Sequence, residues 1–360
     1  MKVGVIGLPQ TGKTTVLNAL TGAHGAVGSS HAPAKVGVGM VKVPDKRVDF
    51  LVELFKPKKV RAATIELEDI GGVFAHLGAG GQQDGQAVAT ARDADALIMV
   101  LRCFADPTVP HVLGSVNPAR DYARMSEELL LADLCVVEHR LEHISKDIKR
   151  APAAARENLQ VELDLLESCH AAVEEGHGIR SVQMSSVQEK MLRSYAFLTL
   201  KPTICLLNVG EDQIEKPVEG WGLTGLEPAP VVMCGRLEME IMELEEAERG
   251  AFMADAGLKE LGASAVIRRC YEALRVRTFF TFANDEVGAW TIQAGDNAVV
   301  AAGKIHSDMA KGFVRAEAVA FDDLKACGSM KDAKAHGKVR LEGRDYEVQD
   351  GDVITFRFGS

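Results

Sequence analysis

Residues 7–14 read GLPQTGKT and match the phosphate-binding pattern G-x-x-x-x-G-K-[ST] at every required position. Residues 1–7, MKVGVIG, are typical of a short buried strand, and residues 14–20 are typical of the start of a helix. Glycines let backbone N–H groups turn toward phosphate oxygens, and a helix N-terminus adds unpaired N–H groups and a favourable dipole. This order of strand, loop and helix predicts a nucleotide phosphate site. A chance match in a glycine turn is the alternative.

The chemistry of this loop predicts roles for its side chains. Lys13 is expected to reach the outer phosphates during catalysis, and the Thr14 hydroxyl is expected to hold Mg²⁺. The residues expected to surround the phosphates are Leu8, Pro9, Gln10, Thr11, Gly12, Lys13, Thr14 and Thr15.

Composition narrows the class of protein. A chain of 360 residues is long enough for two or three domains, and 47% hydrophobic residues suffice for a sizeable core. A net charge of -10 argues against general coating of nucleic acid, and no specific DNA binding is expected. Seven scattered cysteines without metal-ligand spacing are expected to be buried free thiols. With no apolar run long enough for a bilayer and no signal-peptide pattern, we expect a cytoplasmic protein without membrane contact.

The first part of the chain alternates strand-like and helix-like patterns, which favours an α/β fold with a mostly parallel sheet. Residues 65–69 alternate apolar and acidic side chains, as in a strand near a sheet edge. Residues 96–101, ALIMVL, form a continuous apolar run, as in a central parallel strand. Residues 202–208, PTICLLN, predict another such strand.

The middle of the chain has helical periodicity. Apolar residues recur in steps of four and three between 130 and 148 and again between 159 and 173, and Ala151-Pro152 separates the two runs. This pattern predicts an antiparallel helical hairpin with a coiled-coil seam, inserted into the α/β domain. A third helix is expected at 182–198. One larger α/β domain with long crossovers is the alternative.

The last part of the chain predicts a small α+β module. Strands are expected at 278–282, 289–292, 339–341, 346–348 and 353–358, and a short helix at 298–305. The expected domains are therefore a nucleotide-binding domain from 1–118 and 201–275, a helical insertion at 119–200 and a C-terminal module at 276–360.

A second nucleotide motif is Asp69-Ile70-Gly71-Gly72, which follows a strand about 55 residues after the phosphate loop, as a D-x-x-G element does. Asp69 is expected to hold Mg²⁺ through a water molecule, and the Gly72 N–H is expected to contact a γ-phosphate.

The base is expected beside Asn208-Val209-Gly210-Glu211, where guanine-binding GTPases use N-K-x-D. The longer Glu211 side chain is misplaced for the two hydrogen bonds that guanine offers, whereas Asn208 still bonds a purine edge and Val209 offers an apolar surface. This predicts tolerance of, or preference for, ATP over GTP. The backbone of Cys234 and Gly235 is a further candidate for base contact. A plain strand-end turn is the alternative.

Motifs along the whole chain resemble the YchF type of Obg-like ATPase. They are GLPQTGKTTVLNALTG (7–22), VPDKR (43–47), KPKKV (56–60), DIGG (69–72), RCF (102–104), VNPARD (116–121), NVGE (208–211), AWTI (289–292), AAGKIHSDMAKGFVRAEAVAFDDL (301–324) and DYEVQDGDVITFRF (345–358). The resemblance implies a Ras-like P-loop NTPase of the TRAFAC class with a coiled-coil insertion and a C-terminal TGS domain of β-grasp fold.

The resemblance also implies a function. It implies Mg²⁺-dependent ATP hydrolysis, often with GTP accepted, and association with ribosomes or ribosomal RNA. Val73 stands where Ras-like enzymes have a water-orienting glutamine, so turnover is expected to be slow. The family uses a histidine in the loop after RCF, and His111 matches it as a catalytic candidate that positions water. A solvated loop histidine is the alternative.

Two departures from the family leave other functions open. The first switch has Pro33 where the family has a threonine near Mg²⁺, and Lys35 where it has a glutamate. A nucleotide-gated binding module without hydrolysis is therefore one alternative, and a GTP-preferring switch is another.

A basic cluster at 331–344 is either an RNA contact or a solvated loop.

Overall fold

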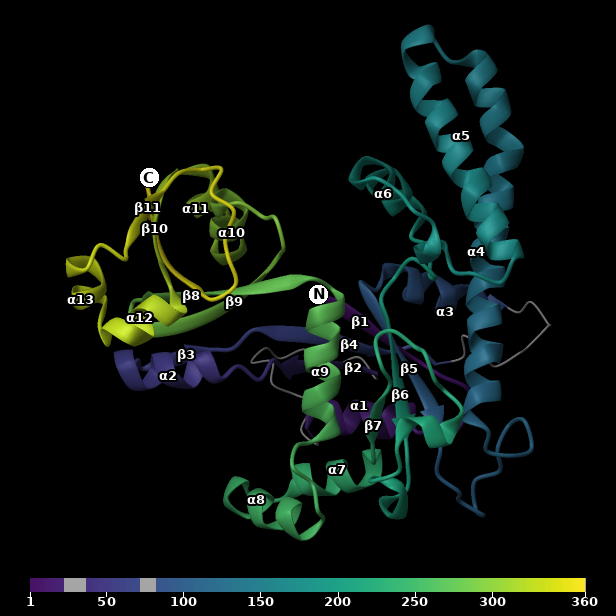
Figure 1. Ribbon diagram of the computed structural model, residues 1–360, viewed down its shortest axis with the longest axis horizontal. Coiled ribbons are helices and arrows are strands. Elements are labelled where there is room, and N and C mark those ends of the chain that lie inside the picture. The colour runs from purple at the N-terminus through teal and green to yellow at the C-terminus, as the bar shows by residue number, and fades with distance from the viewer. Residues whose placement is uncertain (23–36, 72–81, 360) are drawn as a thin grey trace. The chain divides into compact units, whose positions relative to one another are not determined.

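The computed structural model describes residues 1–22, 37–71 and 82–359. The chain forms two compact units, of which the first comprises Met1–Gly39 and Glu66–Val266, and the second comprises Met40–Ile65 and Ile267–Ser360. Figure 1 labels the elements of both units.

The first unit is organised around a sheet with the strand order β2-β4-β1-β5-β6-β7. The strands of this sheet are β1 (Lys2–Ile6), β2 (Val38–Lys42), β4 (Thr64–Asp69), β5 (Ala96–Arg102), β6 (Thr203–Asn208) and β7 (Val231–Met233). Residues 40–42 of β2 and 64–65 of β4 fall within the second unit. β1 runs parallel to β4 and β5, and β6 runs parallel to β5 and β7. This confirms the predicted α/β fold, with the ALIMVL run in a central strand.

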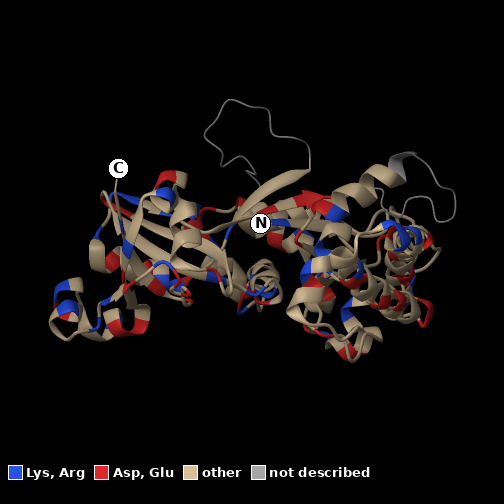
Figure 2. Cartoon of the chain, turned by 90° about the horizontal axis from the view of Figure 1, so that it is seen from above, with Lys and Arg blue, Asp and Glu red and all other residues tan. Residues whose placement is uncertain are grey.

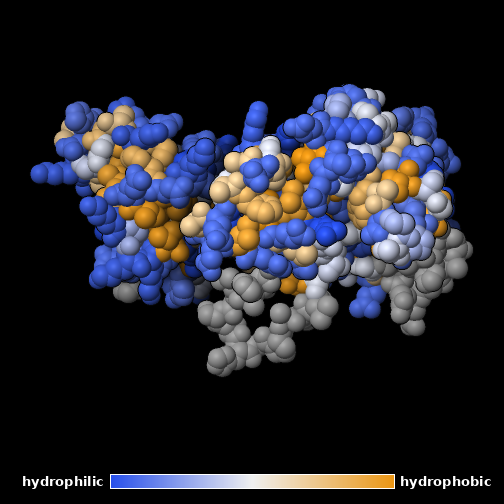
Figure 3. Space-filling model, turned by 90° about the horizontal axis from the view of Figure 1, so that it is seen from below, coloured by the Kyte–Doolittle hydropathy of each residue, from blue (hydrophilic) through white to orange (hydrophobic). Residues whose placement is uncertain are grey.

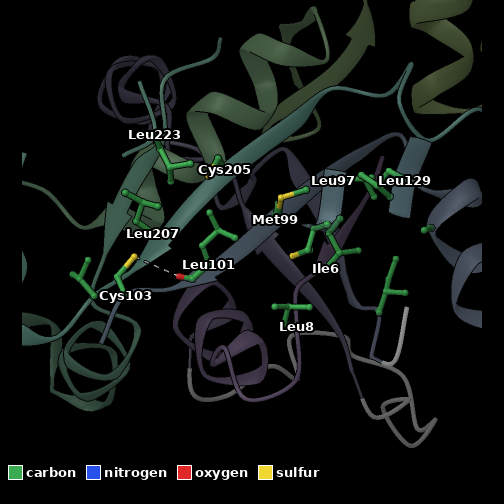
Figure 4. Packing of buried hydrophobic residues seen from close by; sticks show 14 of the residues in the cluster. Ile6, Leu8, Leu97, Met99, Leu101, Cys103, Leu129, Cys205, Leu207 and Leu223 are labelled. Carbon is green, nitrogen blue, oxygen red and sulfur yellow. Dashed lines mark hydrogen bonds between the residues drawn. The ribbon is translucent and has the colours of Figure 1, made fainter. Parts of the chain in front are cut away.

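Apolar side chains on both faces of β5 are buried, which explains its unbroken apolar run. Figure 4 shows one of these faces, where Ile6, Leu97 and Leu101 point into a common cluster. The helices of the unit outside the hairpin region are α1 (Lys13–Thr21), α3 (Gln82–Asp93), η3 (Glu211–Gln213), η4 (Val218–Trp221), α7 (Gly235–Glu243), α8 (Glu246–Asp255) and α9 (Gly262–Ala273), the last of which ends in the second unit.

The predicted helical hairpin is present. Its helices, α4 (Pro118–Arg150) and α5 (Ala153–Glu174), run side by side in Figure 1 and bury Val137, Ile144 and Leu166 between them. They are followed by η1 (Ile179–Ser181), α6 (Ser186–Leu192) and η2 (Arg193–Tyr195).

The third helix is shorter than the predicted 182–198. A capping box fixes its start, because the Ser185 side chain accepts from the Gln188 N–H while the Gln188 side chain bonds back to the Ser185 backbone. Beyond η2, Ala196 adopts a left-handed conformation (φ 50°) that an α-helix does not continue through.

The second unit contains a mixed sheet with the order β11-β10-β12-β8-β9-β3. Its elements are α2 (Lys46–Phe55), β3 (Lys59–Arg61), β8 (Val276–Ala283), β9 (Glu286–Gln293), α10 (Ala298–Ile305), α11 (Ser307–Lys311), β10 (Phe313–Ala320), α12 (Phe321–Cys327), α13 (Met330–Ala335), β11 (Arg340–Glu342) and β12 (Asp352–Phe358). The strand predicted at 346–348 is wrong, because this segment forms only an isolated bridge between Glu347 and Asn297.

Residues 40–65 belong to this second unit, which the sequence patterns did not predict. Leu51 of α2 is buried in the same cluster as Phe280, and the Phe55 ring stacks on Phe282 with centroids 4.3 Å apart. β3 adds a parallel strand beside β9. The three-domain division at 118, 200 and 275 stays a prediction.

Two further observations concern the described ranges. None of the helices there combines the length and the hydropathy that a bilayer span requires. The seven cysteines are free thiols, of which five are buried, Cys135 is exposed and Cys327 is half-buried.

Candidate functional site

The predicted site residues gather at one edge of the first sheet. The register pairs Val5 with Asp69 and Arg102 with Asn208. Because these strands are parallel, their carboxyl ends share an edge, where open α/β sheets bind ligands. The loop between β1 and α1 lies at this edge.

Glycine is required at position 12 of this loop for two reasons. Gly12 has φ 84°, a left-handed conformation, and a Cβ there would lie 2.4 Å from Asn208 Nδ2. A second loop contact is internal, because the Thr11 hydroxyl donates to the Leu8 carbonyl at 3.0 Å. The loop is therefore held by its own side chains and by β6.

Lys13 places a positive charge within the loop. Its Nζ donates to the carbonyl oxygens of Gly7 and Leu8, each at 3.0 Å. Burial lowers the pKa of Lys13, and the negative charge of Asp69 opposes that shift. A cation at this position, together with the N-terminus of α1, attracts an anion to the loop.

Thr14 and Asp69 are brought together across 55 residues of sequence. The Thr14 hydroxyl donates to Asp69 Oδ2 at 2.8 Å. The other carboxylate oxygen, Asp69 Oδ1, is buried and has no hydrogen-bond partner in the described part of the chain. Mg²⁺ prefers oxygen ligands and keeps several waters. A hydroxyl beside a carboxylate with an unsatisfied oxygen therefore fits Mg²⁺, directly or through water.

Asn208 connects three segments of the site. Its side-chain Nδ2 donates to the Thr11 carbonyl at 2.9 Å, and its Oδ1 accepts from the Gly235 N–H at 3.1 Å. The residue is 4% exposed. These contacts fix the loop against β6 and the start of α7.

The expectation that Val209 offers an apolar surface to the base is wrong in this structure. Val209 is 2% exposed and lies in the core cluster, where its N–H donates to the Met233 carbonyl. The Cys234 side chain is also buried there, and burial raises the pKa of its thiol. Glu211 is exposed at the start of η3.

Phe104 is a site residue that the sequence patterns did not single out. A Cβ at Gly12 would lie 3.8 Å from Phe104 Cε1, so this half-buried ring borders the phosphate loop. The buried Arg102 guanidinium lies 4.5 Å from the Phe104 ring centroid and donates to the carbonyls of Phe104 and Val109. The RCF motif contributed to the family resemblance, but its sequence does not indicate that Phe104 lies beside Gly12 of the phosphate loop.

His111, the catalytic candidate, is enclosed by its own loop and α4 in this structure, and its role in positioning water stays a prediction. Its Nδ1 accepts from the Leu113 N–H at 3.1 Å, so the proton of a neutral ring is on Nε2. Nε2 lies 3.0 Å from Asp121 Oδ2, a close electrostatic contact without the alignment of a hydrogen bond, and the His111 side chain is 4% exposed. Nδ1 is thus engaged within the loop, whereas Nε2 faces α4 and has no hydrogen bond in the described part of the chain.

Asp121 explains why this loop encloses His111. It is fully buried in α4, and its other oxygen accepts from Arg120 Nε and Nη2 at 3.0 and 2.7 Å. Arg120 also donates to the carbonyls of Leu113 and Ser115. The VNPARD stretch therefore organises the loop around His111.

Several predicted positions lie outside the described residues. They are Gly72, Val73, Pro33 and Lys35, so the predicted γ-phosphate contact and the first switch stay predictions.

Comparisons with known proteins cover the chain. Residues 276–359 match the YchF-GTPase_C family, described as a protein of unknown function, and residues 2–132 match the family described as 50S ribosome-binding GTPase. The chain is 38% identical over 367 residues to the "Ribosome-binding ATPase YchF" of Bacillus subtilis and 40% identical over 362 residues to that of Haemophilus ducreyi, with 99% of each chain covered. It is also similar to the solved structure of the Schizosaccharomyces pombe YchF GTPase, with a TM-score of 0.88, 28% identity and coverage of 99% of this chain and 97% of that one.

Proposed function

Because the chain belongs to the YchF family, we propose that it is a Mg²⁺-dependent ATPase that binds ribosomes. The observation that carries the enzymatic part is the meeting of Lys13, Thr14 and Asp69 at the loop after β1. This arrangement supplies a cation and two oxygen ligands where the loop backbone supplies N–H groups. These groups together suit a nucleoside triphosphate with its bound Mg²⁺.

In the proposed reaction, water attacks the γ-phosphate in line and yields ADP and phosphate. The loop N–H groups and Lys13 bind the phosphate oxygens and stabilise the charge that develops on them. Thr14 and Asp69 would hold Mg²⁺, directly or through water, and the bound ion would neutralise phosphate charge. The His111 side chain is 4% exposed, with Nδ1 bonded to the Leu113 N–H and Nε2 3.0 Å from Asp121 Oδ2, so its loop has to rearrange before it reaches water, and we expect slow turnover.

We propose ATP as the preferred nucleotide, with GTP accepted. The Phe104 ring beside Gly12 offers an aromatic face that suits any purine. Exposed Glu211 stands where guanine-specific proteins place an aspartate, and Asn208 uses one amide hydrogen for the Thr11 carbonyl and its oxygen for the Gly235 N–H. A GTP-preferring switch is the competing proposal.

A second candidate is a nucleotide-gated binding module without hydrolysis. The enclosed His111 favours this candidate, since the structure holds the expected water-positioning group between Leu113 and Asp121. The departures at Pro33 and Lys35 point in the same direction.

The ribosome part of the proposal rests on the family and not on charge. Basic and acidic residues are interspersed in the view of Figure 2. In the cluster at 331–344, Lys338 pairs with Asp323 at 2.9 Å and Arg340 with Asp352 at 3.2 Å. Figure 3 shows apolar residues on one face in patches separated by hydrophilic ones. A cytoplasmic location is part of the same proposal.

Phosphate release from Mg·ATP tests the enzymatic proposal. The comparison uses the wild type, Lys13→Ala and a matched control, Lys58→Ala, whose 83% exposed side chain lies in the second unit. We expect slow release by the wild type and the control, and loss of release by Lys13→Ala. No release by the wild type would favour the binding module, and equal release by Lys13→Ala would place the chemistry elsewhere. Competition between ATP and GTP decides the nucleotide.

A further inference from the structure

A group of potential metal ligands lies on α4, in a different element from the phosphate loop. His139, Glu142 and His143 are spaced i, i+3 and i+4, so they share one face of the helix. One ligand atom from each of the three lies within 4.8 Å of the others. The two imidazole rings are T-shaped, with centroids 5.0 Å apart.

All three side chains are available to a ligand. Each is exposed, and none forms an ion pair or hydrogen bond with another residue in the part of the chain that the structure describes. Arg140, the cation next to His139 in sequence, is directed to Glu162 and Asp147 by contacts of 2.8 and 2.7 Å. Its charge is therefore already compensated by carboxylates outside the group.

We propose that His139, Glu142 and His143 bind a divalent transition-metal ion of the Zn²⁺ class. Two imidazole nitrogens and one carboxylate oxygen suit Zn²⁺, Cu²⁺ or Ni²⁺, whereas Mg²⁺ and Ca²⁺ prefer oxygen alone. With Zn–ligand bonds of about 2.0–2.2 Å, tetrahedral ligands lie roughly 3.4 Å apart. Rotation of three exposed side chains covers the remaining difference, and the fourth position stays open to water.

The spacing H-x-x-E-H is also the zinc signature of one class of metallopeptidases, in which the glutamate acts as a base. Here Glu142 presents its oxygen within reach of both histidines, and all three residues lie on an exposed helix surface. A peptidase requires a cleft that excludes water around its substrate. The site therefore binds metal without peptide hydrolysis.

Calorimetric titration of the metal-free full chain with ZnCl₂ tests this site. The wild type is compared with His139→Ala/His143→Ala and with a matched control, His177→Ala/His336→Ala, which removes two other exposed histidines. We expect the first double variant to lose one equivalent of bound Zn²⁺ and the control to retain it. Unchanged stoichiometry and affinity in the first variant, or no Zn²⁺ binding by the wild type, would overturn the proposal.

Three further measurements check the folding of the variants and the identity of the ligands. Circular dichroism checks that the variants keep their helix content, and His139→Gln/His143→Gln replaces the alanines if they do not. Glu142→Gln is expected to weaken Zn²⁺ binding at least about tenfold. Even the loss of a residue that only hydrogen-bonds to a metal ligand typically lowers metal affinity about 10–100-fold. Full affinity in Glu142→Gln would show that the Glu142 carboxylate is not a metal ligand.

Electron paramagnetic resonance of one equivalent of Cu²⁺ should show two bound nitrogens, and a signal without nitrogen coupling would contradict the histidine ligands.

Discussion

Asn208 is the residue on which the geometry of the candidate site depends most. Its amide joins the phosphate loop to the start of α7 by bonding the Thr11 carbonyl and the Gly235 N–H. The contact also explains why position 12 is glycine, since a Cβ there would collide with the same amide. A residue expected to read the base thus also holds the loop that we propose to bind phosphate.

Replacing Asn208 with alanine should destabilise both the fold and the site. The substitution leaves the buried Gly235 N–H without its acceptor, which costs about 1–3 kcal/mol. We expect urea unfolding to show this loss and ATP binding to weaken. Asn208→Asp keeps the acceptor but places a carboxylate against the Thr11 carbonyl, so it should also bind ATP poorly. Wild-type stability and affinity in Asn208→Ala would refute the bridging role.

Sequence patterns predicted the site residues whose positions a motif fixes locally. Lys13 and Thr14 follow from the loop spacing, and Asp69 follows from a strand that ends beside it. The surroundings of His111 and Val209 were not predictable from local patterns, because residues of distant elements form them. Asp121 encloses His111 from α4, and Met233 of β7 receives the Val209 N–H. A one-dimensional pattern carries no information about such partners.

At the scale of elements, Glu238 connects α7 to the start of α9. Its two carboxylate oxygens accept from the N–H groups of Gly262 and Ala263 at 2.8 and 2.9 Å. The residue is 2% exposed, and burial raises its pKa from 4.5 to about 7 against the opposing effect of these hydrogen bonds. The folded state therefore binds a proton more tightly here than the unfolded chain does.

This pKa predicts how stability depends on pH. Glu238 contributes fully to the free energy of unfolding below about pH 4.5, where it is protonated in both the folded and the unfolded state. This contribution is lost as the pH rises through about 7. The unfolding free energy of the wild type, from urea titrations between pH 5 and 8, should therefore fall more steeply than that of Glu238→Gln. Glu240→Gln, an exposed change on the same helix, serves as control and should match the wild type. Equal slopes for all three proteins would contradict this assignment.

The limits of element prediction have local physical causes. The parallel strands were predictable because continuous apolar runs report burial on both faces. Residues 346–348 alternate like a strand, but Tyr346 and Gln349 instead bond the buried carboxylate of Asp352. The early end of the third helix depends on the capping box at Ser185 and the left-handed Ala196, which apolar periodicity does not encode.

At the scale of the whole molecule, the second unit is assembled from two distant stretches of chain. Residues 40–65 supply Leu51 to the cluster around Phe280 and Val353, and Phe50 contacts Phe321 with ring centroids 5.5 Å apart. Arg47 also pairs with Asp350 at 2.6 Å. The C-terminal sheet therefore depends on a segment that sequence patterns placed in the nucleotide domain.

A fragment comparison tests this dependence. A chain that links 40–65 to 267–360 should unfold cooperatively, whereas 267–360 alone should be less stable by at least about 2 kcal/mol. Burial of one large apolar side chain such as Leu51 contributes about 1.5–3 kcal/mol. Urea unfolding followed by circular dichroism measures the difference. Equal stability of the two fragments would show that residues 40–65 contribute nothing to this unit.

The central claim is that the loop around Lys13 binds the phosphates of a nucleotide, and calorimetric titration of the folded full chain with Mg·ATP tests it most directly. We predict saturable binding with one site per chain in the wild type and its loss in Lys13→Ala. Absence of binding heat over a range of temperatures in the folded wild type, or equal affinity in Lys13→Ala, would contradict the claim.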